Sequence, residues 1–144
     1  MIKIRKYQNK DQKQVFEIVK DLNSDMPEDK LEDIKDIKKF YFQNQGSFFI
    51  AEDKNKIIGT IGIEQEGKIK ARIKRLYILE EYRRKGIAQK LLDKAINFCK
   101  KNKYKKVILT TLYNLKPALN FYKKNNFIIY KKDEFIHLKR DIES

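Results

Sequence analysis

An α/β fold is predicted for this chain of 144 residues by three observations. Short segments of alternating apolar residues, typical of strands, are interspersed with segments whose apolar residues recur at helical spacing. A basic, glycine-containing turn joins a strand-like run to a helix-like run, an arrangement suited to holding a phosphate group. The length and the apolar content of 41% are those of one globular domain with one core. We therefore predict a single α/β domain over residues 1–144.

The N-terminal segments predict one strand and two helices. Residues 2–7 alternate as a strand, and residues 11–22 carry one apolar helical face. A second helix is expected over residues 27–43, opened by its proline and ended by Gly46. Its apolar residues recur at the spacing of a single buried face.

Three strands are expected in the middle of the chain. Residues 47–52 and 56–64 form a predicted hairpin around the turn at 53–55. A longer strand follows over residues 68–79, and its length predicts a bulge or a splay.

The C-terminal part alternates between helices and strands. A helix is predicted over residues 87–102 and a buried strand over residues 107–112. Residues 117–124 form a short helix, since a proline suits its first turn. Residues 127–131 and 134–139 are expected to close the sheet as an antiparallel pair.

The turn before the helix at 87–102 is the predicted anion site. Free N–H groups of a turn and of a helix N-terminus point to one place, where the helix dipole adds positive potential. Gly86 allows close approach of the backbone to an anion or a positive φ. Three cationic side chains supply charge, and arginine can bind two oxygens at once. They are Arg83, Arg84 and Lys85.

This turn resembles the pyrophosphate loop of the GNAT superfamily of N-acetyltransferases, Arg/Gln-x-x-Gly-x-Gly/Ala, in the form Arg83-x-x-Gly86-x-Ala88. Further segments resemble the family in the same order along the chain. Residues 48–53 and 57–62 resemble its second and third strands, and residues 75–78 its fourth strand. Residues 118–122 and 126–127 resemble its "A-x-x-x-Tyr" helix and "Gly-Phe" signature, with Asn126 replacing the glycine. Asparagine tolerates the left-handed conformation that a glycine adopts.

The resemblance implies the GNAT fold, a mixed central sheet whose fourth and fifth strands splay apart. It implies an acetyl-CoA-dependent N-acetyltransferase that passes acetyl directly to a primary amine, with coenzyme A and an amine-bearing acceptor as its partners. Pantetheine would bond to the main chain of the fourth strand, and the pyrophosphate to the basic turn. The implied cofactor-binding residues are Leu76, Tyr77, Ile78, Arg83, Arg84, Lys85, Gly86, Ile87, Ala88 and Asn114.

At the catalytic positions, the chain matches the family pattern at one residue and departs from it at another. Tyr122 stands where the family places the proton donor to the leaving thiolate; the alternative is that it merely packs beside the cofactor tail. Arg72 stands where many members have a glutamate base, and it cannot take a proton. Glu64, or Glu66, is the candidate base, unless both are simply solvated hairpin charges. The single histidine, His137, is interpreted as structural or peripheral, and no metal site is predicted.

The charge distribution leaves the partner open. The net charge is +14, and residues 68–106 carry fifteen Lys/Arg against three acidic residues. This basic block would steer a polyanion such as coenzyme A to the turn. Nucleic acid is another polyanion, so a catalytically weak GNAT-fold module that binds nucleic acid or acts as a regulator is the alternative, as is a tRNA-linked amino-acid acetyltransferase. A monomer and a homodimer are both compatible with the sequence.

Two further features concern location and acceptor. Cys99 is the one cysteine and falls on an apolar helical stripe, so we expect a core residue and a reducing, cytoplasmic compartment. The sequence has no signal-peptide pattern or membrane-length apolar run, so no membrane partner is expected. Six acidic residues at 25–36 form either a solvated face or an electronegative lip that attracts a cationic amine.

Overall fold

Seven strands form one mixed sheet in the order β1-β2-β3-β4-β5-β7-β6. The computed structural model describes residues 1–113 and 115–143. Adjacent strands are antiparallel except β4 and β5, which are parallel. The strands are β1 (Ile2–Lys6), β2 (Ser47–Asp53), β3 (Lys56–Gln65), β4 (Lys70–Ile78), β5 (Lys106–Thr111), β6 (Ile128–Lys132) and β7 (Ile136–Asp141). The predicted α/β fold with a mixed sheet is confirmed.

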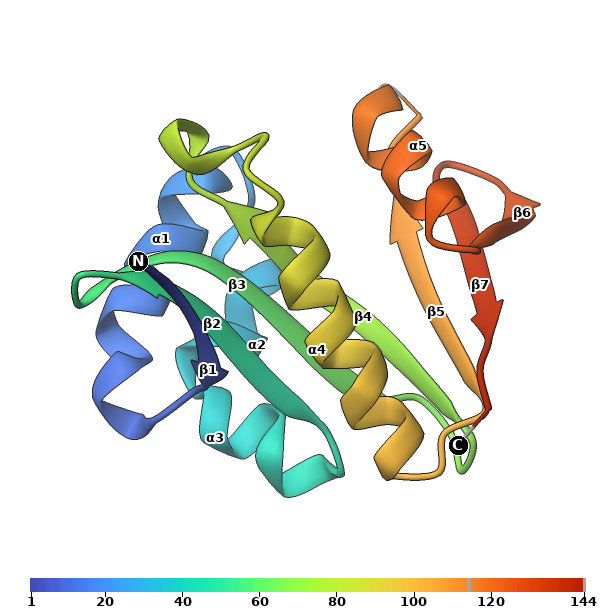
Figure 1. The fold of residues 1–144 in the computed structure, drawn as a ribbon, viewed down its shortest axis with the longest axis horizontal. Helices are drawn as coiled ribbons and strands as arrows, with labels where there is room; N and C mark the ends of the chain where they lie inside the picture. Colours follow the sequence, from blue (N-terminus) through green and yellow to red (C-terminus); the bar gives the residue numbers. More distant parts are fainter. Residues whose placement is uncertain (114, 144) are drawn as a thin grey trace.

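Helices cover both faces of this sheet, as Figure 1 shows. One core lies beneath α4, and a second lies beneath α1, α2 and α3 on the opposite face. Cys99 is fully buried in the first core, as its place on the apolar stripe predicts. The α-helices are α1 (Gln12–Leu22), α2 (Glu32–Lys35), α3 (Ile37–Phe40), α4 (Ile87–Lys101) and α5 (Lys116–Lys124). Short 3₁₀ turns span Asn9–Asp11, Glu28–Leu31, Phe42–Asn44 and Glu80–Tyr82.

The helix predicted over residues 27–43 is wrong, because the segment is broken into 3₁₀ turns, α2 and α3. The chain becomes extended at Asp36, with φ −148° and ψ 84°. Gln12 of α1 occupies this break: its amide donates to the carbonyl of Ile34 at 2.7 Å and accepts from the N–H of Ile37 at 3.0 Å. A side chain from another helix thus satisfies the backbone groups that a continuous helix would pair internally. The predicted inward face is nevertheless buried.

Strand β4 contains the expected bulge. Its register with β3 shifts between Thr60 and Gly62, opposite Arg75, which has φ +58°. The buried Thr60 hydroxyl donates to the Arg75 carbonyl at 2.8 Å and so fixes the irregular backbone. Such a bulge bends a strand and redirects its side chains.

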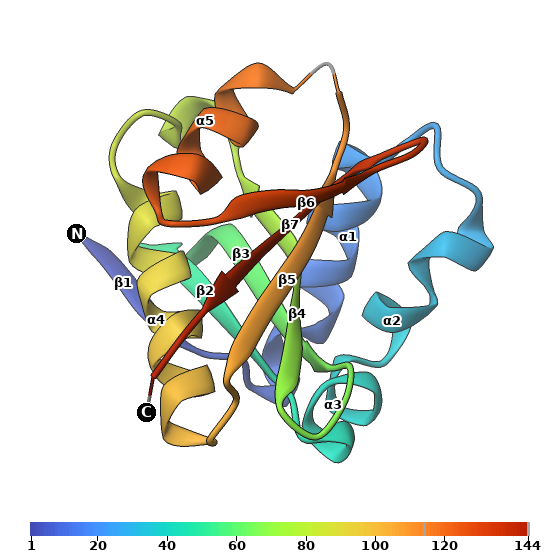
Figure 2. The same cartoon turned by 90° about the vertical axis from the view of Figure 1, so that its right-hand side faces the viewer.

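Strands β4 and β5 pair over a short stretch and then separate (Figures 1 and 2). Their parallel register joins residues 70–72 to residues 106–108. Beyond it, β5 continues along β7 while β4 continues along β3. The predicted splay of the fourth and fifth strands is confirmed.

Two smaller observations complete the fold. Asn126 has φ +71°, so it does adopt the left-handed conformation expected at that position. Within residues 1–113 and 115–143, no helix has the length and apolar character needed to cross a membrane.

Candidate active site

A cavity of about 550 Å³ lies between the separated strands, within the range of small-molecule sites. Strands β4 and β5 form two walls, and the start of α5 with Tyr122 forms a third. Residues from the loop after α1, and Phe135 from the β6–β7 turn, close the remaining side. Among the residues that the structure describes, no aspartate or glutamate lines this cavity.

The basic turn at residues 83–88 lies at the end of β4 and leads into α4. Gly86 has φ +77° and precedes the first helical residue. The backbone N–H groups of residues 84–89 donate to no acceptor in the described chain. A Cβ built on Gly86 would meet nothing within 4 Å, so the space over the turn is open. The turn therefore offers both the donors and the room that a pyrophosphate needs.

The three cationic side chains of this turn differ in their contacts, although all three residues are exposed. Arg83 donates from Nε to the carbonyl of Ile78 at 3.1 Å, which ties the turn to the end of β4. Lys85 places Nζ 5.5 Å from the centre of the Tyr82 ring. Arg84 has φ +63° and forms no ion pair among the described residues.

Tyr122 and Tyr77 both line the cavity, from α5 and from β4. Burial raises the pKa of Tyr122 to about 12, and the neighbouring Tyr77 adds to this rise. A phenol in this state is protonated throughout the neutral pH range, as a proton donor must be. Within the described part of the chain, the Tyr122 hydroxyl has no hydrogen-bond partner, so it is available to a ligand.

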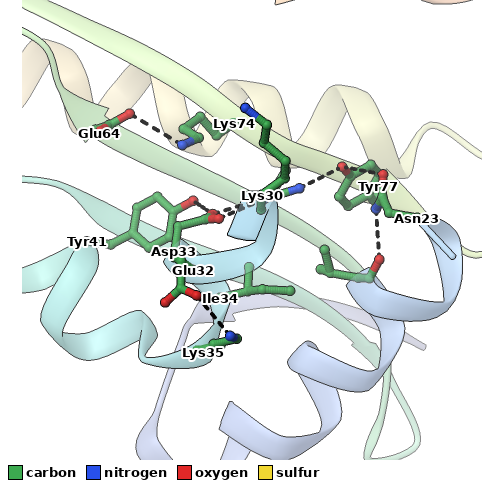
Figure 3. Close-up of polar contacts among 12 residues, drawn as sticks. Asn23, Lys30, Glu32, Asp33, Ile34, Lys35, Tyr41, Glu64, Lys74 and Tyr77 are labelled. Carbon is green, nitrogen blue, oxygen red and sulfur yellow. Dashed lines mark hydrogen bonds and ion pairs between the residues drawn. The ribbon is translucent and has the colours of Figure 1, made fainter. Parts of the chain in front are cut away.

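A polar network supports one wall of the cavity, as Figure 3 shows. Arg75, at the bulge, donates to both carboxylate oxygens of Asp33 at 2.6 and 3.0 Å. Tyr41 donates to the same carboxylate at 2.5 Å. Arg75 also donates to the Tyr77 hydroxyl at 3.3 Å, and that hydroxyl donates to Asn23 at 3.4 Å. The network joins the end of α1, α2 and α3 to the cavity wall.

The acidic segment 25–36 is therefore not one uniform surface. Asp33 is buried in the network, although both sequence interpretations would leave it exposed. Its burial would raise the pKa of its carboxyl, but the hydrogen bonds from Arg75 and Tyr41 outweigh burial and lower it. Glu32 pairs with Lys35 on the surface, and Asp25 lines a shallower hollow beside the cavity.

The candidate bases lie outside the cavity lining. Glu64 places its carboxylate 3.7 Å from Nζ of Lys74, as Figure 3 shows. Glu66 accepts from Arg72 at 2.9 and 3.3 Å. Arg72 itself does line the cavity and donates to the Thr110 hydroxyl at 2.9 Å. The carboxylates are thus engaged with cations at the edge of the site.

Residues 14–127 match the sequence profile described as the Acetyltransferase (GNAT) family. The chain belongs to the GNAT acetyltransferase family. GNAT proteins are acyltransferase enzymes that use acetyl-CoA, and the resemblance seen in the sequence is confirmed.

Two relatives of this GNAT chain are themselves named as acetyltransferases. Human N-acetyltransferase 8 is 35% identical over 85 residues, which are 55% of this chain and 37% of that protein. Streptothricin acetyltransferase A of Bacillus subtilis is 31% identical over 103 residues, 71% of this chain and 60% of that protein. The chain thus spans between 37% and 60% of the length of these two relatives.

Solved structures share the GNAT fold over the whole chain. A GNAT-family acetyltransferase of Staphylococcus aureus superposes with a TM-score of 0.91 at 24% identity, covering 99% of this chain and 100% of that chain. The PaiA N-acetyltransferase of Thermoplasma acidophilum, in complex with coenzyme A, superposes with a TM-score of 0.77 at 24% identity, covering 99% of both chains.

The structure brings most of the predicted GNAT site residues to one edge of the sheet. Leu76, Tyr77 and Tyr122 line the cavity. Ile78 ends β4 and leads to the turn formed by residues 83–88. Asn114 lies outside the residues that the structure describes. The roles of these residues in cofactor binding and catalysis stay predictions.

The sequence interpretation missed one group beside the cavity. Thr110 of β5 lines it, and its hydroxyl lies 3.2 Å from Nδ1 of His137 on β7. Asp133, in the β6–β7 turn, lies 2.9 Å from Nε2 of the same ring. A single histidine is a visible signal, but its neighbours follow from strand register, which brings Thr110 opposite His137. The histidine thus links a residue of the cavity wall to the β6–β7 turn, and its role stays a prediction.

Proposed function

We propose that this GNAT protein transfers the acetyl group of acetyl-CoA directly to the primary amine of an acceptor, with residues 1–144 acting as one N-acetyltransferase domain. The observation that carries the proposal is the position of β4, which lines the cavity together with Tyr122 and leads at its end to the turn with free N–H groups at residues 84–89. A ligand with a pyrophosphate at one end and a thioester at the other spans these two features.

The turn and the edge of β4 are the parts that would bind coenzyme A. The N–H groups around Gly86 would hold the pyrophosphate, and Arg84 and Lys85 would add charge. Beyond residue 72 the edge of β4 that faces β5 has no strand partner in the described chain, so the main chain of Leu76 and Ile78 is open to pantetheine.

Tyr122 would donate the proton to the leaving sulfur. Its pKa of about 12 lies above the ordinary thiol value of about 8.5, so a standing phenolate is unfavourable. The Tyr122 proton would therefore move to the sulfur as the C–S bond breaks, and Tyr122 would regain a proton within the same turnover. Holding amine and thioester in one cavity supplies much of the remaining acceleration.

The test is the release of free thiol from acetyl-CoA in the presence of an amine panel. The panel contains polyamines, amino acids, aminoglycosides and peptides, with acetyl-CoA alone as the blank. Thiol release that depends on an amine, with the acetylated amine seen by mass spectrometry, supports the proposal. If calorimetry detects no acetyl-CoA binding at millimolar ligand, the proposal fails.

A further inference from the structure

A continuous chain of hydrogen bonds leads from the cavity wall to the β6–β7 turn. Arg72 donates to the Thr110 hydroxyl at 2.9 Å, and this hydroxyl lies 3.2 Å from Nδ1 of His137. Nε2 of the same ring lies 2.9 Å from a carboxylate oxygen of Asp133. The four side chains come from β4, β5, β7 and the turn before β7. Arg72 and Thr110 line the cavity.

The chemistry of the end groups, Arg72 and Asp133, fixes the direction of each hydrogen bond in this series. A guanidinium donates and cannot accept, so the oxygen of Thr110 accepts from Arg72. An ionised carboxylate can only accept, so in the neutral imidazole the ring proton lies on Nε2 and is donated to Asp133. Nδ1 is then unprotonated and accepts the hydroxyl proton of Thr110. Asp133 is suited to this role, because the backbone N–H of Phe135 and the ring of His137 lower the pKa of its carboxyl.

An unprotonated imidazole nitrogen is thus connected to the cavity through Thr110, whereas the nearby carboxylates are held by cations. No carboxylate lines the cavity within the described residues. Glu66 is held by Arg72 in two hydrogen bonds, and Glu64 lies against Lys74. Of the groups that bond to the cavity lining, His137 is one that can accept a proton without first breaking an ion pair.

We propose that His137 takes the proton that the acceptor ammonium must lose, with Thr110 as the relay. This proposal rests on the proposed acetyl transfer. The acceptor ammonium gives a proton to the oxygen of Thr110 as the hydroxyl proton of Thr110 passes to Nδ1 of His137. The resulting imidazolium is stabilised by Asp133, and it releases the proton to solvent through its partly exposed edge.

The proton balance of the full reaction is then closed. The neutral amine attacks the thioester carbonyl, the N–C bond forms and the C–S bond breaks. The amine nitrogen loses two protons in becoming an amide. The first leaves through Thr110 and His137. The second replaces the proton that Tyr122 gives to the sulfur of coenzyme A.

The charged and titratable groups near His137 lie on β4, β6, β7 and the β6–β7 turn. Asp133 lies on its own turn, and Lys131 of β6 pairs with Asp133 at 3.6 Å. The centre of the Tyr130 ring lies 6.1 Å from that of the imidazole, and Nζ of Lys139 lies 5.7 Å from the centre of the same Tyr130 ring. On the β5 side the neighbour is the neutral Thr110, which separates the imidazole from the positive charge of Arg72. Asp133 is therefore the carboxylate in direct contact with the ring.

The hydrogen-bond arrangement around His137 is tested first by the ¹⁵N NMR shifts of the imidazole. Their assignment is unambiguous because the chain contains one histidine. In the wild-type protein we expect the neutral ring to carry its proton on Nε2. Thr110→Val removes the hydroxyl at nearly constant shape and should change the Nδ1 shift, whereas Thr110→Ser should preserve it. A ring protonated on Nδ1, or an unchanged Nδ1 shift in Thr110→Val, would overturn the proposal.

The proton role is tested by kinetics with acetyl-CoA and the best amine from the panel. His137→Gln and Thr110→Val should each lower kcat/KM about 100-fold, the usual scale of general base catalysis, with acetyl-CoA affinity and melting temperature preserved. Thr110→Ser should stay within about threefold of wild type, because the relay needs the hydroxyl. In His137→Gln the rate should keep rising with pH until the acceptor amine is itself neutral.

The remaining outcomes separate the two proposals. If no amine in the panel raises thiol release by wild type above the blank, the proposed function fails, and this inference fails with it. If wild type is active and His137→Gln matches it at every pH, the inference alone is overturned. The same holds if Glu64→Gln lowers the rate while His137→Gln does not, since Glu64 would then be the base.

Discussion

The carboxylate of Asp33 and the guanidinium of Arg75 form a two-point ion pair across 42 residues of sequence, at 2.6 and 3.0 Å. Both side chains are nearly inaccessible, 4% and 8% exposed. The pair holds the bulge residue of β4 against α2, and it places Tyr77 on the cavity wall through a further hydrogen bond. It is therefore a link between the packing of the N-terminal helices and the shape of the candidate site.

Asp33→Asn is expected to destabilise the protein by about 3–5 kcal/mol, because it leaves the buried guanidinium without a counter-charge. The measurement is urea unfolding at pH 7. Glu32→Gln is the matched control, since it removes a neighbouring carboxylate from an exposed pair with Lys35 and should change the free energy of unfolding little. Equal effects of the two variants would contradict the structural role of the buried pair.

The same carboxyl predicts a direction for acid unfolding. The pKa of Asp33 is lower in the folded protein than its ordinary value of about 3.9. Its stabilising contribution is therefore complete above that ordinary value and is lost as the pH falls through the lower, folded value. Below about pH 4 the stability of the wild type should fall toward that of Asp33→Asn, as urea unfolding at a series of pH values would measure.

Gly86→Val is expected to weaken acetyl-CoA binding at least tenfold, measured by calorimetry. Gly86 has φ +77°, which a β-branched residue adopts at high cost, and the added methyl groups would occupy the open space above the turn. Gly67→Ala is the control, because that glycine has open space around it, ordinary φ and a place in the β3–β4 turn. Unchanged affinity in Gly86→Val would mean that the turn does not contact the phosphates.

Tyr122→Phe should lower kcat about 100-fold or more while the KM for acetyl-CoA stays nearly constant. The ring would still pack against the cavity, but the proton offered to the sulfur would be absent. Because the pKa of Tyr122 is raised to about 12, the wild-type rate should not decline between pH 7 and 10 through loss of this proton. Tyr104→Phe removes a hydroxyl bonded to Gln45, away from the cavity, and should affect stability alone. A Tyr122→Phe enzyme with wild-type kcat would show that solvent protonates the thiolate.

The basic block at residues 68–106 should make acetyl-CoA binding moderately sensitive to salt. A few phosphates release few counterions, whereas a duplex that contacts many phosphates gives a steep dependence. Titrations of acetyl-CoA and of duplex RNA at increasing salt compare the two slopes directly. Tight RNA binding that persists at physiological salt would favour a nucleic-acid-binding role over a small amine acceptor.

Local patterns in the sequence predicted most of the elements and the open turn at residues 83–88, because both depend on neighbouring residues. The turn at Gly86 needed only a glycine, basic residues and a helix start. The break at Asp36 was not predictable, since it depends on the amide of Gln12 from another helix. The contacts of His137 were missed for a similar reason: they depend on the β5–β7 register and on the turn that carries Asp133.

The short parallel register between β4 and β5 divides the sheet into two parts that share few backbone bonds. On the far side of the gap, the amides of Gln89 in α4 and Asn125 after α5 bond reciprocally at 2.7 and 3.0 Å. The short strand pairing and the amide pair therefore connect the two parts of the sheet on either side of the gap. If the proposed coenzyme A bonds to the open edge of β4 and packs on α5, it will bridge these two parts of the sheet. The melting temperature of the protein is then expected to rise as this ligand is added, because the ligand binds only the folded state.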